Sequence, residues 1–140
     1  MRRDFLFLAD AATGAEGKLY VHGGGLTEVH PPKLPWMHPQ IAVVFRLEVE
    51  PDDEREDHSF EIRVVGPHDE AVTPTFQATL THQELTARKG RPPFFVQAAV
   101  TLAPIPIREL GQHRVELWLD GEPAGSEQFF VTDQALGSGQ

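Results

Sequence analysis

Histidines are the residues of this chain best suited to chemistry, because an imidazole titrates near neutral pH and is the commonest metal ligand. There are seven, at positions 22, 30, 38, 58, 68, 82 and 113. A metal site on one strand needs His-x-His, since alternate residues point to the same side of a strand. Neither that pattern nor His-Glu-x-x-His occurs, so a metal site would have to be assembled from distant loops. The histidines that cluster in sequence, His22, His30 and His38, are the candidate ligands for such a site.

Other catalytic and cofactor patterns are missing. The acidic stretch 52–57 lacks the Asp-x-Asp-x-Asp-Gly spacing of a calcium loop and is interpreted as a solvated turn. No Gly-Lys-Ser/Thr follows Gly23-Gly24-Gly25, which indicates a backbone requirement rather than a phosphate loop. None of the three serines lies in Gly-x-Ser-x-Gly, and the lack of cysteine excludes thiol nucleophiles and cysteine-based metal sites. We therefore expect no catalytic site and no cofactor.

The charge balance bears on partners. A net charge of −9 repels phosphate backbones and anionic membrane surfaces, so we expect neither nucleic acid nor membrane as a partner. The basic stretch Arg88-Lys89-Gly90-Arg91 has no interleaved aromatic residues and is interpreted as a solvated loop. The apolar run 5–9 between Asp4 and Asp10 is shorter than the roughly 7–15 residues of a signal sequence. Together with the absence of cysteine, this favours a cytoplasmic location.

The elements that must position these residues are predicted to be short strands. Twelve glycines and twelve prolines punctuate apolar runs, as in chains of many strands joined by turns. In the run 41–50, Val43, Phe45 and the following odd-numbered residues are apolar, which predicts a half-buried strand. We expect it to form a hairpin with the alternating run 60–64. Further strands are expected at residues 5–12, 18–29, 75–81, 94–102, 115–119 and 122–131, with a bulge or strand switch at 23–25 and no regular structure in the proline-rich segment 30–40.

Two local signals are specific. Asp120-Gly121 predicts a tight hairpin, although the sequence leaves open whether Phe129 or Phe130 faces the core. Thr81-His82-Gln83-Glu84 has the spacing of a capping box and predicts one short helical turn. The expected fold is an all-β, antiparallel immunoglobulin-like or C2-like β-sandwich of about 7–8 strands. It occupies residues 1–132 as a single domain, and residues 133–140 are expected to form a flexible tail.

The order of several short motifs resembles an uncharacterised family of small bacterial single-domain proteins of unknown function. The motifs are Leu8-Ala9-Asp10, Gly17-Lys18-Leu19 before Gly23-Gly24-Gly25, and Gly111-x-His113 before Leu119-Asp120-Gly121-Glu122 and Phe129-x-Val131. The resemblance implies an immunoglobulin-like domain spanning the chain and supplies no activity. It also implies a tyrosine corner at position 113, where this chain has a histidine whose ring N–H can replace the phenol.

Apolar residues outside the expected core indicate binding surfaces. Trp118 has the opposite parity from Val115, Leu117 and Leu119, and is predicted to face away from the core with Val44 and Val65. Trp36 and Met37 lie in the proline-rich segment, where Trp36 can either bind a partner or plug the edge of the core. The leading hypothesis is a non-catalytic protein-interaction or self-association module that docks through Trp118 or residues 31–39. The alternatives are a metal-binding protein or metal-dependent enzyme using His22, His30 and His38, and, less favoured, a small-ligand or carbohydrate module.

Overall fold

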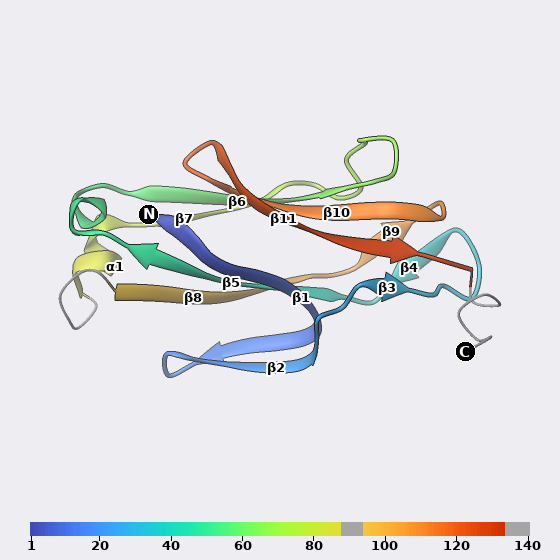
Figure 1. Cartoon of the computed structure of the whole chain (residues 1–140), viewed down its shortest axis with the longest axis horizontal. Helices are drawn as coiled ribbons and strands as arrows, with labels where there is room; N and C mark the ends of the chain where they lie inside the picture. The colour runs from blue at the N-terminus through green and yellow to red at the C-terminus, as the bar shows by residue number, and fades with distance from the viewer. Residues whose placement is uncertain (88–93, 134–140) are drawn as a thin grey trace.

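A computed structural model describes residues 1–87 and 94–133 and shows two β-sheets packed face to face (Figure 1). The four-stranded sheet has the order β2 (Lys18–Gly24), β1 (Arg2–Ala15), β5 (Ile41–Val49), β8 (Phe94–Leu102). The five-stranded sheet has the order β3 (Glu28–Val29), β11 (Glu122–Val131), β10 (Gly111–Leu119), β6 (His58–Val65), β7 (Phe76–Leu80). A two-stranded sheet pairs β4 (Trp36–His38) with β9 (Ile105–Ile107). The expected all-β sandwich is confirmed.

The core follows the alternation of the sequence. In β5, Phe45 and Leu47 are buried against the inward residues of β6 and β10, such as Ile62 and Leu117. The rings of Phe45 and Phe60 meet edge to face across the sandwich, with centroids 5.2 Å apart. Each such side chain contributes roughly 1.5–3 kcal/mol through burial. This contact also fixes β5 directly opposite β6.

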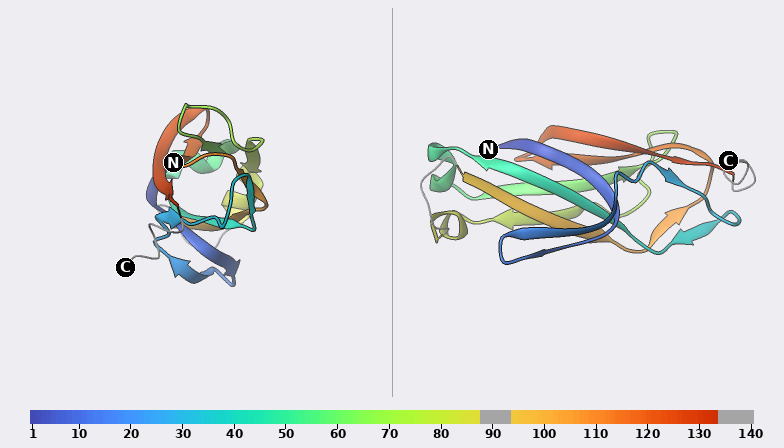
Figure 2. Two further views of the ribbon diagram at one scale, coloured as in Figure 1. Left: turned by 90° about the vertical axis from the view of Figure 1, so that its right-hand side faces the viewer. Right: turned by 60° about the horizontal axis from the view of Figure 1, so that its bottom comes forward.

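β1 is much longer than expected, and it belongs to two layers. Its first half pairs with β5, whereas residues 9–15 pair with β2 and form a ribbon that leaves the sandwich (Figure 2). The ribbon lies over the outer face of the four-stranded sheet, where Val44 and Ala42 pack beneath Leu19 and Val21. The prediction that Val44 faces solvent was therefore wrong, because this extra layer buries it completely.

The glycine triplet marks the change of sheet, as the sequence indicated. Gly23 and Gly25 have φ angles of +64° and +79°, and a Cβ on Gly23 would lie 2.1 Å from an Asp10 carboxylate oxygen. β2 ends at Gly24, the Gly25 N–H donates to the Leu8 carbonyl oxygen, and the chain continues into β3 of the other sheet. Glycine is thus required here by backbone conformation and close approach.

The predicted hairpin between the runs 41–50 and 60–64 was wrong, because β5 and β6 lie in different sheets. The acidic stretch forms a 3-10 helix, η1 (Pro51–Arg55), that carries the chain across the gap of roughly 10 Å between packed sheets. The Asp53 carboxylate accepts the Glu50 N–H at 2.7 Å and pairs with the Met1 amine at 2.6 Å. These contacts fix the turn as a crossover rather than a hairpin.

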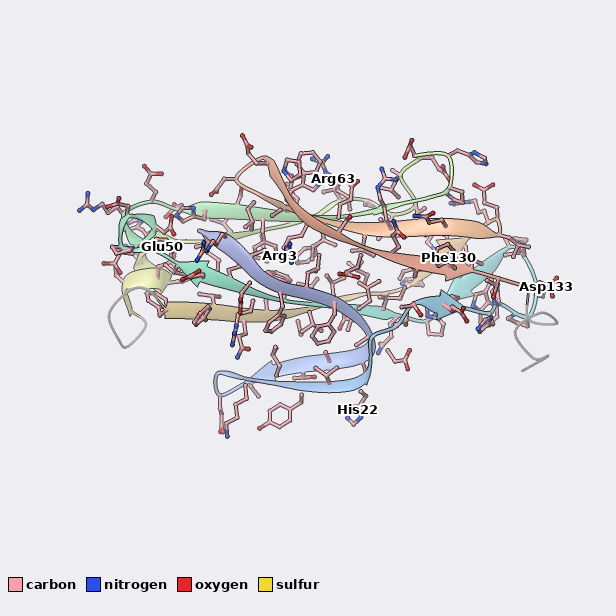
Figure 3. All side chains as sticks on the ribbon, viewed as in Figure 1. Arg3, His22, Glu50, Arg63, Phe130 and Asp133 are labelled. Carbon is pink, nitrogen blue, oxygen red and sulfur yellow. The ribbon has the colours of Figure 1, made fainter. Side chains whose placement is uncertain are left out.

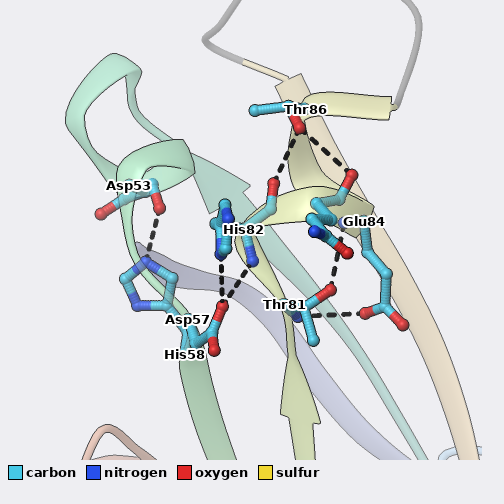
Figure 4. Close-up of polar contacts among 8 residues, drawn as sticks. Asp53, Asp57, His58, Thr81, His82, Glu84 and Thr86 are labelled. Atoms are coloured by element: carbon cyan, nitrogen blue, oxygen red, sulfur yellow. Dashed lines mark hydrogen bonds and ion pairs between the residues drawn. The ribbon is translucent and has the colours of Figure 1, made fainter.

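His58 pins this crossover to the neighbouring hairpin. Its Nδ1 lies 2.7 Å from Asp120 Oδ2, and its Nε2 lies 2.7 Å from the Asp53 carbonyl oxygen. Although burial opposes the charged ring, these hydrogen bonds raise the pKa of His58 above its ordinary value. Figure 4 shows this end of the molecule, where the Asp57 carboxylate also accepts the backbone N–H of His82 at 2.7 Å.

The two specific local predictions are confirmed. Asp120 and Gly121 both have positive φ and form a two-residue turn, and a bulge after Leu117 leaves Phe129 fully buried and Phe130 42% exposed. Thr81 Oγ1 accepts the Glu84 N–H, and a Glu84 carboxylate oxygen accepts the Thr81 N–H, both at 3.1 Å (Figure 4). These two hydrogen bonds cap α1 (His82–Ala87). The side chain of Leu85 in α1 is fully buried. The basic stretch 88–91 and the predicted tail beyond residue 133 lie outside the described residues.

Candidate interaction surface

The outer face around Trp118 is polar rather than apolar. Trp118 does face away from the core, but the Arg63 guanidinium lies 4.0 Å from its ring centroid and its indole N–H donates to Glu116 at 3.1 Å. Glu61 and Arg114 continue this charged face through ion pairs with Arg63 and Glu116, both at 2.7 Å (Figure 3 labels Arg63). Trp118 is therefore half-buried and surrounded by charged side chains rather than by a larger apolar surface.

Val65, expected beside Trp118, does not face solvent. It is 7% exposed because the chain after β6 returns at Ala71 and forms a β-bridge with it. That prediction was wrong for the same reason as the one for Val44, namely a segment that folds over a sheet face. The proposed Trp118 surface therefore loses both of its apolar companions.

The proline-rich segment contains a short strand that the sequence did not predict. Trp36 is opposite Ile107 in the pairing of β4 with β9, and its ring packs against the main core, which favours its interpretation as a plug. Met37 is 55% exposed. Leu34 and Leu110 line one pocket with Pro31 and Pro32, and the charged residues Lys33 and Asp133 line it as well.

The three candidate metal ligands lie in different surroundings. His22 is exposed on the outer ribbon and points away from the sandwich (Figure 3). His30 lies 3.1 Å from Glu28 and 2.6 Å from Thr132 Oγ1. His38 is half-buried in β4, where burial lowers its pKa against the opposing effect of Asp10. Within residues 1–87 and 94–133, no three histidine, aspartate or glutamate side chains are placed to hold one metal ion.

The side of the sandwich bounded by β7 and β8 is different from all of these. β8 is the last strand of one sheet and β7 the last strand of the other, and no described strand pairs with their outer edges. Side chains of both strands are mostly half-buried or exposed, whereas the neighbouring β5 is almost completely buried. We call this the open side. At one end of it α1 joins the two strands (Figure 1), and Leu85 of α1 packs in one cluster with Leu80, Phe94 and Val96.

The two strands of the open side contain no charged residue. Neither Phe76–Leu80 nor Phe94–Leu102 contains an aspartate, glutamate, lysine, arginine or histidine, although 24% of the chain is Asp, Glu, Lys or Arg. The strands also contain no proline, and β8 pairs with β5 over nine residues without a register shift. Charges, prolines and bulges are the devices that usually protect edge strands from further pairing. Neither strand contains any of them, although α1 covers one end of the two strands.

The two open edges are also aligned with each other. Ala98 of β8 is opposite Phe45 of β5, and Ala78 of β7 is opposite Phe60 of β6. Because the rings of Phe45 and Phe60 touch across the core, the two alanines lie at the same level on the two edges. Both also pack against the main core cluster. A pocket of about 300 Å³ between residues 73–76 and 101–104 opens on the same side.

Sequence reasoning predicted both strands but not that they are the edges. The strand order across a sheet depends on contacts between distant segments, and the absence of charge in 76–80 and 94–102 is also typical of buried strands. The available signal was the run of sixteen uncharged residues 92–107, which includes β8, in a chain of net charge −9.

Comparisons with known proteins place the chain in a family but give it no activity. No curated protein matches it. The solved structure of the Pseudomonas fluorescens alkylpurine DNA glycosylase AlkC bound to DNA containing an abasic site analog aligns with 76% of this chain at 16% identity and a TM-score of 0.43. The alignment spans only 27% of the glycosylase chain, and a likeness at this level carries no inference about DNA.

No helix of the described residues is long and apolar enough to cross a membrane. Residues 4–132 match the family of unknown function DUF6941, and the chain belongs to that family.

Proposed function

We propose that this protein is a non-catalytic self-association module in which a second copy of the chain pairs with the open side formed by β7 and β8. The observation that supports this best is the pair of aligned, uncharged edge strands at Ala78 and Ala98. Their outer backbone N–H and C=O groups need hydrogen-bond partners, and an added strand supplies them in the geometry of a sheet.

The residue order of β8 fits a second β8 running antiparallel to it. With a two-fold axis at Ala98, Phe94 lies opposite Leu102 of the other copy, and Val96 lies opposite its Val100. These pairs continue the inner, apolar face of the sheet. On the outer face, Phe95 lies opposite Thr101, so no position meets a charge.

The residue order of β7 allows the same two-fold pairing with a second copy. Around Ala78, Phe76 lies opposite Leu80 and Gln77 lies opposite Thr79 of a second β7. Because Ala78 and Ala98 lie at one level, a single two-fold axis can serve both sheets. The interface is then isologous, as in most soluble homodimers, and the two sandwiches share two continuous sheets.

The net charge of the chain also favours the open side as the contact surface. Each copy carries a net charge of −9, so contacts through most of the surface bring carboxylates together. The open side avoids this repulsion. The contact area is limited to the edges of two strands, so we expect a weak dimer with a dissociation constant on the order of 10 µM.

Light scattering coupled to size exclusion tests the proposal on the unmodified chain. The molar mass is expected to rise from 15.6 kDa toward twice that value as protein concentration rises through the micromolar range. More salt is expected to favour the dimer, because salt screens the repulsion between two acidic copies. A mass that stays at one chain up to millimolar concentration contradicts self-association.

A further inference from the structure

A second feature, formed by residues outside β7 and β8, is a pocket of about 450 Å³ between the loop after β6 and the connection from β9 to β10. Val72 and Pro106 form apolar parts of its wall, and Glu70, Glu109 and the buried His113 also line it. Volumes of this size accommodate small organic ligands.

His113 is held rigidly in the wall of this pocket. It is 2% exposed, and its ring stacks on Phe129 with centroids 5.1 Å apart. Its Nδ1 lies 3.1 Å from the Gly111 carbonyl oxygen. Because a carbonyl only accepts, Nδ1 carries the hydrogen of this bond. The ring thus bonds to the backbone two residues upstream, whereas the tyrosine-corner interpretation of position 113 stays a prediction.

The other ring nitrogen is available to a ligand. No hydrogen bond of the described residues involves His113 Nε2. Among the same residues, every fully buried side-chain nitrogen or oxygen has a hydrogen-bond partner. Since Nε2 has no partner, it is not fully buried. His113 lines the pocket, so the accessible part of its ring borders that space.

Carboxylates add negative charge beside this ring. Glu70 accepts the backbone N–H of His68 at 2.8 Å, and Glu109 lies 3.2 Å from the His68 ring. Hydrogen bonds from its own backbone N–H and from that of His68 lower the pKa of Glu70, which keeps it ionised at neutral pH. Arg108 is exposed and also lines the pocket, and it is the pocket's one arginine or lysine among the described residues.

We infer that this pocket binds a small organic amine, with the protonated amino group donating to Glu70 and His113 Nε2 and the apolar body against Val72 and Pro106. Each acceptor on the protein then meets a donor, and the positive charge of the ligand meets the negative charge of the carboxylates. The inference is independent of self-association, because it uses neither β7 nor β8.

Nuclear magnetic resonance of the histidine ring nitrogens tests it with 2-phenylethylamine as the probe and phenylacetate as a probe of similar shape and opposite charge. The amine is expected to shift His113 Nε2 with half-saturation in the range of about 1–10 mM, which suits a fragment of this size. Phenylacetate is expected to leave the resonance in place. No saturable shift with the amine, or tighter binding of phenylacetate, overturns the inference.

Two variants locate the effect without disturbing the buried histidine. Glu70→Gln keeps the side-chain size and is expected to weaken amine binding about tenfold, because it removes a charge-assisted hydrogen bond. Glu16→Gln makes the same change at the tip of the outer ribbon and is expected to bind the amine like the unmodified chain. Equal affinity of Glu70→Gln and the unmodified chain overturns the assignment of Glu70.

Discussion

Ala99→Lys is expected to convert the dimer to a monomer. Ala99 lies on the outer face of β8, next to the proposed two-fold axis at Ala98. In the antiparallel pairing, the two introduced ammonium groups lie diagonally across the axis, with their Cβ atoms about 7–8 Å apart. We expect the dissociation constant to rise at least about tenfold, or about 1.4 kcal/mol, as measured by sedimentation equilibrium.

A matched variant separates this effect from a general effect of charge. Thr27→Lys adds the same charge at an exposed position next to β3, at the opposite edge of the five-stranded sheet. It is expected to dimerise at least as well as the unmodified chain, because it reduces the net negative charge. If Thr27→Lys dissociates the dimer and Ala99→Lys does not, the interface does not involve β8.

Val44→Asp is expected to destabilise the monomer by about 3–5 kcal/mol. Val44 is fully buried between the four-stranded sheet and the ribbon of β1 and β2, in a cluster of apolar side chains. The new carboxylate must either remain buried or displace the ribbon. The free energy of unfolding in urea measures the cost.

Tyr20→Asp is the control for this substitution. Tyr20 lies on the same ribbon but is 52% exposed, and the change is expected to cost no more than about 0.5–1 kcal/mol. A small effect of Val44→Asp, comparable with that of Tyr20→Asp, would show that the ribbon does not cover the sheet in solution.

The sequence predicted local structure well where short-range physics decides it. Alternation located β5 and its inward residues, the Asp120-Gly121 pair located a turn, and the capping box at Thr81 predicted α1. Each of these signals is contained within about ten residues. The β-sandwich follows from many such strands, whereas the finer immunoglobulin-like assignment stays a prediction.

The errors all concern which layer covers which strand. A bend in β1 buries Val44, a returning loop buries Val65, and the crossover at η1 separates β5 from β6. Alternation shows which residues share a face, but it does not show whether another segment folds over that face. The candidate site was missed for a related reason, because an uncharged strand has the same sequence signal at an edge as in a sheet interior.

The most direct test of the proposed interface is oxidation of an Ala98→Cys variant, since the natural chain contains no cysteine. On the two-fold axis, the Cα atoms of position 98 in the two copies are expected to lie about 4.5–5.5 Å apart, within the range that a disulfide spans. Thr101→Cys on the same strand is more exposed, but its two copies would lie roughly 20 Å apart. The account predicts a disulfide-linked dimer for Ala98→Cys and little for Thr101→Cys, as measured by non-reducing electrophoresis. Equal cross-linking of both variants, or faster cross-linking at position 101, would contradict it.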